Sequence, residues 1–197
     1  ILVDFPIYGG SYTTAEYTVQ ALKDLGCQVE TMDNAIADPM LQYMLKMEKY
    51  QNAVIPKLNE LMSDLLWEKF LSFKPHIVFC LAQAPISQHL INAIRQSGSI
   101  VAFWFVEDFR RFPYWNDVIK YIDYFFVIQK GEFSNQLKDF PQTISRYLPM
   151  ACSPQIHLKL PKDAIENDYS SDISFMGAAF ANRVNFFSHF TDYNLKL

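Results

Sequence analysis

The chain has 197 residues, of which 50% are hydrophobic and 19% are charged, and its formal net charge is −4. A length of about 200 residues is typical of one large domain, or of one domain with part of a second, and this composition excludes wholesale disorder. The acidic balance argues against a dedicated nucleic-acid binder, and the longest uninterrupted apolar run, Ile100 to Val106, is too short to span a membrane.

Strand and helix patterns alternate from the start of the chain. A short apolar run is followed by Gly9 and Gly10, and Gly26 stands where a helix-ending glycine is expected. Asp38-Pro39 is typical of an N-cap with proline at the first helical position. The predicted elements are a strand over 1–6, a helix that begins at Thr13 or Thr14 and ends at Leu25, a strand over 27–32, and a helical region from 38 to 73 that is broken before Pro56.

The middle of the chain continues the alternation as far as residue 150. Its strands lack polar alternation, which favours a parallel sheet covered on both faces. We therefore predict a Rossmann-like, doubly wound α/β domain over residues 1–150. Its further predicted elements are strands over 76–82, 100–106, 123–129 and 143–148, and helices over 86–96 (stopped by Gly98), 114–121 and 132–138.

Residues 151–171 differ in character because they hold Pro154, Pro161 and a polar run, and we predict a connector there. Beyond it, a strand over 173–176 is followed by Gly177, a helix capped by Asn182, and another strand over 194–197. This order repeats the layout of residues 1–25 without sequence similarity. We predict that residues 172–197 begin a second α/β domain, and we expect the chain to be cut at both ends.

The cysteines Cys27, Cys80 and Cys152 lie far apart and form no Cys-x-x-Cys pair. An odd number does not indicate a disulfide framework, so we predict buried, reduced thiols. The chain shows no charged segment followed by a long apolar one, so it shows no signal peptide. These observations predict a cytoplasmic protein.

Several common motifs are absent from the sequence. It has no Gly-x-Gly-x-x-Gly fingerprint, no P-loop and no Gly-x-Ser-x-Gly nucleophile elbow. Its histidines have no metal-binding spacing, and it has no Asp-x-Asp pair. We therefore predict no metal site and no bound cofactor.

The first candidate site is the segment Gly9-Gly10-Ser11, which follows the first predicted strand. Open α/β sheets bind ligands at the carboxyl ends of their strands. Glycines let backbone amides approach a ligand, and the start of the next helix favours an anion or a sugar hydroxyl. The alternative is a tight turn that binds nothing.

The second candidate site follows the buried strand over 100–106 and contains Glu107, Asp108 and Arg110. Either carboxylate could accept a proton from a hydroxyl, and the arginine could hold a phosphate or a carboxylate. Tyr114 and Trp115 offer aromatic faces for a sugar ring. The alternative is that the carboxylates cap the next helix and pair with the arginines.

The third candidate site is the turn after the strand over 173–176. Gly177 could admit a diphosphate to the backbone amides of a helix start, where Asn182 and Arg183 could bind it. The alternative is a turn with a solvated arginine. We also expect His157, in the connector, to face a cleft between domains.

Several segments match a known pattern in their order and spacing. They are Val101–Arg110, Tyr114-Trp115, Tyr121–Tyr124, Ile128-Gln129, Tyr147–Pro154 with His157, and Asp172–Gly177 with Asn182-Arg183. Together they resemble the CgeB-like glycosyltransferases, a family named for spore-maturation proteins. The resemblance covers most of the chain from about Lys74 onward, together with the Gly9-Gly10 loop.

The resemblance implies a GT-B architecture, in which two Rossmann-like domains face a cleft and no metal is required. It implies that the N-terminal domain shapes the acceptor site and that Gly177 and Arg183 belong to the start of the donor domain. Acceptor-side positions would include Gly9, Gly10, Glu107, Asp108 and Arg110. Because the chain stops at Leu197, most of such a donor site would be missing, and we expect this fragment to be inactive.

The leading hypothesis is a metal-independent glycosyltransferase that moves a sugar from a nucleotide-diphosphate sugar to a hydroxyl of a glycan, a protein or a small molecule. Glu107 or Asp108 would be the catalytic base. One alternative is a binding module that recognises a glycan or a nucleotide without chemistry. Another is a sugar-nucleotide epimerase of the same architecture. Nucleic acid is not an expected partner.

Overall fold

The computed structural model describes residues 1–47, 49, 51–159, 161 and 171–196. The chain divides into two compact units, residues 1–151 and 152–197. Residues 162–170, which form part of the predicted connector, lie outside the described residues. Leu197, the last residue of the last predicted strand, lies outside them as well.

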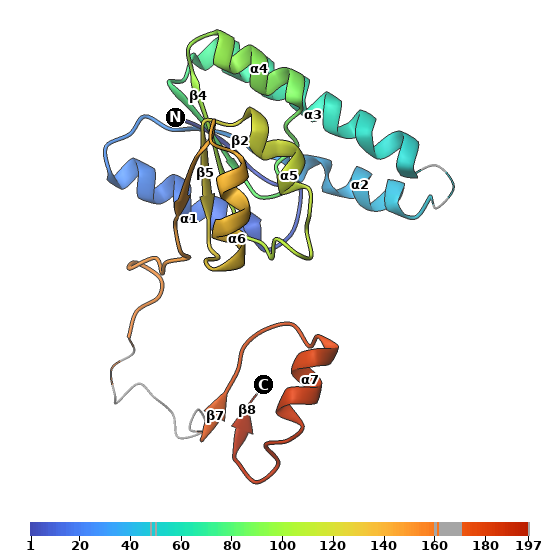
Figure 1. Ribbon diagram of the computed structural model, residues 1–197, viewed down its shortest axis with the longest axis vertical. Helices are drawn as coiled ribbons and strands as arrows, with labels where there is room; N and C mark the ends of the chain where they lie inside the picture. Colours follow the sequence, from blue (N-terminus) through green and yellow to red (C-terminus); the bar gives the residue numbers. More distant parts are fainter. Residues whose placement is uncertain (48, 50, 160, 162–170, 197) are drawn as a thin grey trace. The chain divides into compact units, whose positions relative to one another are not determined.

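The first unit is built on a six-stranded sheet in the order β2-β1-β3-β4-β5-β6, with every strand parallel to its neighbours (Figure 1). The prediction of a doubly wound α/β fold is therefore confirmed. The chain moves from β1 to β2 on one side and later returns to place β3 on the other side of β1. The strands are β1 (Leu2–Asp4), β2 (Glu30–Met32), β3 (Ile77–Leu81), β4 (Ile100–Phe105), β5 (Tyr124–Val127) and β6 (Ile144–Tyr147).

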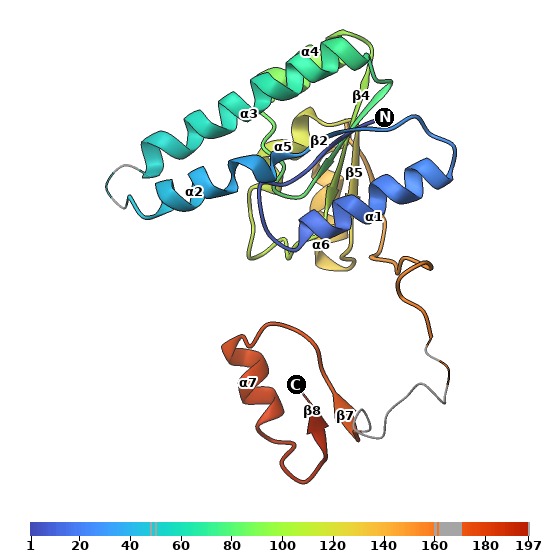
Figure 2. The same ribbon diagram turned by 180° about the vertical axis from the view of Figure 1, so that it is seen from behind.

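Helices cover both faces of this sheet, as the two views in Figures 1 and 2 show. Helix α1 (Ser11–Asp24) packs on one face, against Val3, Leu81 and Trp104. The opposite face carries the larger core, to which α3 contributes Leu66 and α4 contributes Ile91. The helices beside this core are α3 (Gln51–Phe73), α4 (Gln88–Gln96), α5 (Trp115–Val118) and α6 (Glu132–Gln136), with short 3-10 turns η2 (Ile119–Tyr121) and η3 (Leu137–Asp139).

Aromatic side chains fill much of the larger core. The Phe103 and Phe125 rings stack at 5.8 Å, and Phe105 lies 5.8 Å from Phe133 on α6. All four side chains are almost completely buried. Burying a side chain of this size contributes about 1.5–3 kcal/mol, so these rings fix the strands that lead to the candidate site.

Glycines lie next to both ends of helix α1. Gly26 has φ +81° and donates its N–H to the Lys23 carbonyl, while Cys27 donates to Leu22. These two bonds confirm Gly26 as the helix-ending residue. The helix begins at Ser11, earlier than the predicted Thr13 or Thr14, because Gly10 already has a helical backbone conformation at the N-cap position.

The region over 34–73 differs from its prediction at two points. A 3-10 turn, η1 (Asn34–Ala37), precedes α2 (Asp38–Leu45), so Asp38 is the first helical residue and not the N-cap. Helix α3 runs through Pro56 without a break. Leu58, Met62 and Leu66 recur every four residues and are buried, so tertiary packing holds the helix despite the lost hydrogen bond.

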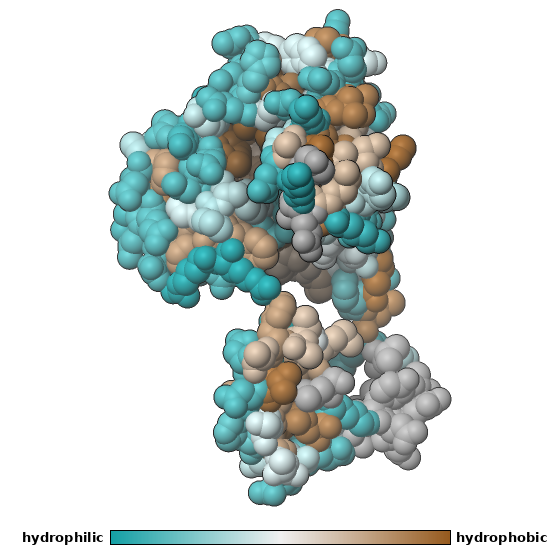
Figure 3. Space-filling view, turned by 90° about the vertical axis from the view of Figure 1, so that its right-hand side faces the viewer, coloured by the Kyte–Doolittle hydropathy of each residue, from teal (hydrophilic) through white to brown (hydrophobic). Residues whose placement is uncertain are grey.

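Helices α2 and α3 also expose apolar side chains. Met40, Tyr43, Leu61 and Leu65 are each about half or more exposed. Figure 3 views the side of the molecule on which these helices lie, and apolar patches interrupt its hydrophilic surface. Among the described residues, no helix is long and apolar enough to cross a bilayer.

The second unit holds a short strand–helix–strand arrangement. Strands β7 (Ile173–Ser174) and β8 (Leu195–Lys196) are parallel neighbours, and α7 (Ala181–Phe187) lies between them in the sequence. The predicted cap was wrong, because the extended residue Phe180 occupies the N-cap position and Asn182 is the second helical residue. The Phe180 carbonyl accepts the first helical hydrogen bonds, and no side chain caps the helix.

The cysteines make no disulfide with one another. Cys80 is buried, Cys27 is half-buried and Cys152 is exposed. The prediction of buried thiols is therefore right for Cys80 and wrong for Cys152, because Cys152 lies just beyond the packed part of the first unit.

Candidate functional site

The candidate site lies where β1, β3 and β4 end at the same edge of the sheet. The strand order reverses direction between β1 and β3. In open α/β sheets this reversal point opens a crevice at the carboxyl ends of the strands, and ligands bind there. The segments that follow these three strands are the Gly9 loop, Gln83 and Glu107.

The glycine loop presents its backbone to solvent. Gly9 has φ +91°, a conformation that only glycine adopts readily, and it is exposed. Gly10 is also exposed, and no side chain caps the helix that follows it. Backbone N–H groups at the start of α1 can therefore receive a ligand oxygen. Ser11, by contrast, is nearly buried as the first residue of α1.

Glu107 is held by two donors from different parts of the chain. Its Oε1 accepts a short hydrogen bond from the Gln83 Nε2, and its Oε2 accepts one of 2.7 Å from the Tyr114 hydroxyl. Burial, together with this bond to Glu107, raises the pKa of Tyr114 well above its usual range. The structure therefore brings the predicted residues Glu107 and Tyr114 together, with the tyrosine protonated.

Gln83 links this pair to the glycine loop. Its backbone N–H donates to the Tyr114 hydroxyl over 3.0 Å. A Cβ placed on Gly9 would lie 3.4 Å from the Gln83 Oε1. The glycine loop and Glu107 therefore share one neighbour, as expected from two predicted sites on the same rim. Sequence reasoning missed Gln83, since a glutamine after a buried strand carries no signal of its left-handed backbone.

Asp108 and Arg110 make local contacts. The Asp108 Oδ1 accepts the Arg110 N–H over 2.9 Å, and its carbonyl accepts from the two residues beyond. The Arg110 guanidinium lies over the Phe109 ring and bonds Glu132 over 2.6 Å. Asp108 thus caps a turn, which agrees in part with the alternative interpretation, whereas the salt bridge of Arg110 is to Glu132 on α6 and was not predicted.

Trp115 does not offer a stacking face. It is only 6% exposed, its indole N–H donates to the Phe109 carbonyl, and its ring packs 4.8 Å from Phe133. The prediction that Trp115 stacks on a sugar is therefore wrong, because its ring is buried in the core between α5 and α6. With Arg110 and Glu132, it lines a pocket of about 490 Å³ beside these helices.

A buried polar cluster lies beneath the glycine loop. Asp4, the last residue of β1, is 1% exposed, and its Oδ1 accepts from the Asn34 Nδ2 over 2.8 Å. Asn34 also donates to the Phe5 carbonyl, which leads into the loop. Burial raises the pKa of Asp4 to about 8, so its carboxyl is protonated at neutral pH. The neighbouring Asp33 accepts from the Tyr12 hydroxyl in the first turn of α1.

The predicted residues of the second unit lie in local structure. A Cβ on Gly177 would approach the Phe175 ring to 2.7 Å, so a larger residue would have to displace that side chain. Arg183 donates to the Ala178 carbonyl over 3.1 Å, and its guanidinium lies between the Phe175 and Phe180 rings. Asn182 is exposed. His157 is also exposed, and its Nδ1 accepts the N–H of Ser153.

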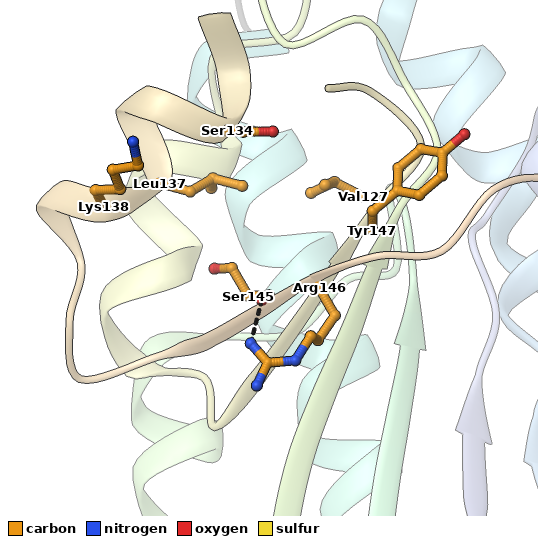
Figure 4. Close-up of a pocket in the computed structure, with 7 residues that line it drawn as sticks. All are labelled: Val127, Ser134, Leu137, Lys138, Ser145, Arg146 and Tyr147. Carbon is orange, nitrogen blue, oxygen red and sulfur yellow. Dashed lines mark hydrogen bonds between the residues drawn. The ribbon is translucent and has the colours of Figure 1, made fainter. Parts of the chain in front are cut away.

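A further pocket of about 190 Å³ lies between α6 and the edge strand β6 (Figure 4). Val127 and Leu137 point toward each other across it, and Ser134 directs its hydroxyl inward. None of the predicted site residues lines it. Within the described part of the chain, no three potential ligands among His, Cys, Asp and Glu gather in a way that could hold a metal ion.

Comparisons of the chain with models of known protein families, with curated proteins and with solved structures found no match. The site therefore has to be interpreted from its own geometry.

Proposed function

We propose that the first unit is the acceptor-binding domain of a glycosyltransferase that uses a nucleotide-diphosphate sugar. The observation that carries the proposal is that Glu107 is held between Gln83 and Tyr114, and that Gln83 also lies against Gly9 of the glycine loop. This group lies at the reversal point of the sheet, where ligands of this fold class bind.

The polar groups of this edge suit a sugar better than a simple anion. The start of α1 offers N–H donors, while Glu107 and the Gln83 Oε1 offer acceptors. A sugar hydroxyl is both donor and acceptor, so it can satisfy both kinds of group. An anion would meet the Glu107 carboxylate and be repelled by it.

The proposed reaction uses Glu107 as the base. Its carboxylate takes the proton of an acceptor hydroxyl while the hydroxyl oxygen forms a bond to the anomeric carbon of the donor sugar. The bond from that carbon to the diphosphate oxygen breaks, and the nucleoside diphosphate leaves with the electron pair. The two donors that hold Glu107 fix the direction of its oxygens, and each oxygen keeps a lone pair for the proton.

The donor-side residues remain predictions. Gly177, Asn182 and Arg183 are predicted to contact the diphosphate, and Arg183 is the weakest of these candidates because its guanidinium already bonds the Ala178 carbonyl. His157 and Arg110 likewise remain predictions, in their case as contacts of the acceptor. Asp108 is the weaker candidate base, because its Oδ1 already caps its own turn.

A binding module without chemistry is the second candidate. The same hydrogen bonds favour this candidate, since each Glu107 oxygen already accepts one hydrogen bond within the protein. Glu107→Gln separates the two candidates. A transferase loses turnover by a factor of about 100 or more and keeps its acceptor affinity, whereas a binding module has no turnover to lose. An epimerase would instead change the nucleotide sugar without an acceptor.

The test incubates the intact protein, and not this fragment alone, with uridine, guanosine, thymidine and adenosine diphosphate sugars and a panel of methyl glycosides. Release of the nucleoside diphosphate that requires the glycoside supports the proposal. Asp117→Asn, an exposed carboxylate on α5, is the matched control for Glu107→Gln and should leave turnover unchanged. If no member of the panel binds and no nucleoside diphosphate is released, the proposal is contradicted.

A further inference from the structure

Gln83 has an unfavourable backbone conformation at the centre of the candidate site. Its φ is +68°, and it lies two residues after Leu81, the buried end of β3. A residue with a Cβ is crowded in this region, and glycine would occupy it without strain. The side chain of Gln83 therefore has to contribute something that glycine could not.

The orientation of the Gln83 carboxamide is fixed by its partners. A carboxylate only accepts hydrogen bonds, so the group facing Glu107 has to be the Nε2 donor. The Oε1 then points toward Gly9, whose Cβ position lies 3.4 Å away. Among the described residues, this buried oxygen has no hydrogen-bond partner.

An unpaired buried carbonyl oxygen is uncommon, because folding removes its water without replacing it. Gly9, a glycine with a positive φ in an exposed loop, lies against this oxygen and presents no side chain to it. A small displacement of that loop would open the Oε1 to a group with a hydrogen to donate.

We infer that Gln83 is the specificity-determining residue of this site, and that its Oε1 accepts a hydrogen bond from a hydroxyl of the acceptor sugar as the Gly9 loop moves aside. The inference rests on the proposed function, because it names one contact of that acceptor. Its ligand is a neutral polyol with a hydroxyl next to the one that Glu107 deprotonates. The Gln83 Oε1 contacts the hydroxyl that keeps its proton. The Gln83 Nε2 orients the Glu107 carboxylate toward the neighbouring hydroxyl, which Glu107 deprotonates.

The experiment compares two ligands in two proteins. Methyl glycosides and their single-deoxy analogues are titrated into the wild-type chain and into Gln83→Leu, which keeps the bulk and the backbone constraint but removes both polar atoms. We expect one deoxy position to weaken wild-type binding by about tenfold and to have no effect in Gln83→Leu, because the two changes remove the same hydrogen bond. Equal losses in both proteins would overturn the inference.

A second measurement needs only the wild-type chain, in case Gln83→Leu does not fold. The side-chain amide signals of Gln83 are followed by NMR during the titration. They should move with the parent glycoside and stay in place with the deoxy analogue. If the parent binds without moving them, this inference fails and the proposed function stands. If no glycoside binds the wild type, both fail.

Discussion

The molecule contains two junctions in which a strand, a glycine and a helix follow one another. In the first, Gly9 leads from β1 into a helix of 14 residues, and its neighbour across the sheet is Gln83. In the second, Gly177 leads from β7 into a helix of seven residues, and its neighbours are Phe175 and Arg183.

The difference between the two junctions lies in the elements around them. Gly9 lies against the side chain of Gln83, which is distant in the sequence and follows the neighbouring strand β3, and Gln83 in turn binds Glu107. Gly177 meets only residues of its own loop and helix, and Arg183 fills the turn by bonding Ala178. A strand–glycine–helix pattern thus becomes a candidate site only where neighbouring strands end beside it with polar groups.

The largest expected effect concerns Asp4, which supports the first junction from below. Asp4→Asn mimics the protonated carboxyl, because its amide is neutral at every pH and its oxygen can still accept from the Asn34 Nδ2. In the wild type the pKa of Asp4 is about 8 when folded, against 3.8 for a carboxyl in water, so unfolding releases a proton at pH values between the two. The free energy of unfolding should therefore fall with rising pH by up to about 1.4 kcal/mol per pH unit.

Urea denaturation between pH 4 and about pH 8 measures this slope. Asp4→Asn should remove it, and Asp117→Asn should keep it. The adjacent Cys80 thiol does not add to the slope, because burial raises its pKa well above its usual value and it stays neutral. A wild-type stability that does not change over this range would show that Asp4 is ionised in the folded protein.

The second effect concerns the two glycines of the first junction. Gly9→Ala should cost about 1–2 kcal/mol of stability, because φ +91° is strained for alanine. Gly10→Ala is the matched control, since Gly10 has φ −65° and its Cβ would meet nothing within 4 Å. Thermal denaturation compares the two variants. Equal costs would mean that backbone strain does not distinguish these positions.

The sequence predicted the frame of this junction but not its chemistry. The buried strands and Gly26 were predictable because apolar runs and helix-ending glycines are local signals. Gln83 and Asp4 were not, because a left-handed backbone and a protonated carboxylate depend on strands that are distant in the sequence. Trp115 was misassigned for the same reason: its surroundings on α6 decide whether an aromatic ring is exposed.

The third effect concerns Gly177. A methyl group at this position would press on the Phe175 ring and on the Arg183 guanidinium, both of which are side chains that can move. We expect Gly177→Ala to cost about 1 kcal/mol of stability of the second unit. Hydrogen exchange at the amides of β7 and β8 measures it. Unchanged protection there would show that the turn accommodates a side chain.

The smallest effect should come from Arg183. Because its guanidinium is already bound to Ala178 and lies between two rings, Arg183→Gln should change the affinity for uridine diphosphate by less than about twofold. Isothermal titration measures this affinity. A loss of tenfold or more would make Arg183 a diphosphate ligand and the two junctions functionally alike.

The most direct test of the account is an NMR titration of the protein with methyl glycosides, in which every backbone amide is followed. The account predicts that the amides of Gly9, Gly10, Gln83 and Glu107 shift together, with one dissociation constant, while those of Gly177 and Arg183 remain in place. Shifts confined to the second unit, or to the pocket beside β6, would contradict the assignment of the site to the edge where β1, β3 and β4 end.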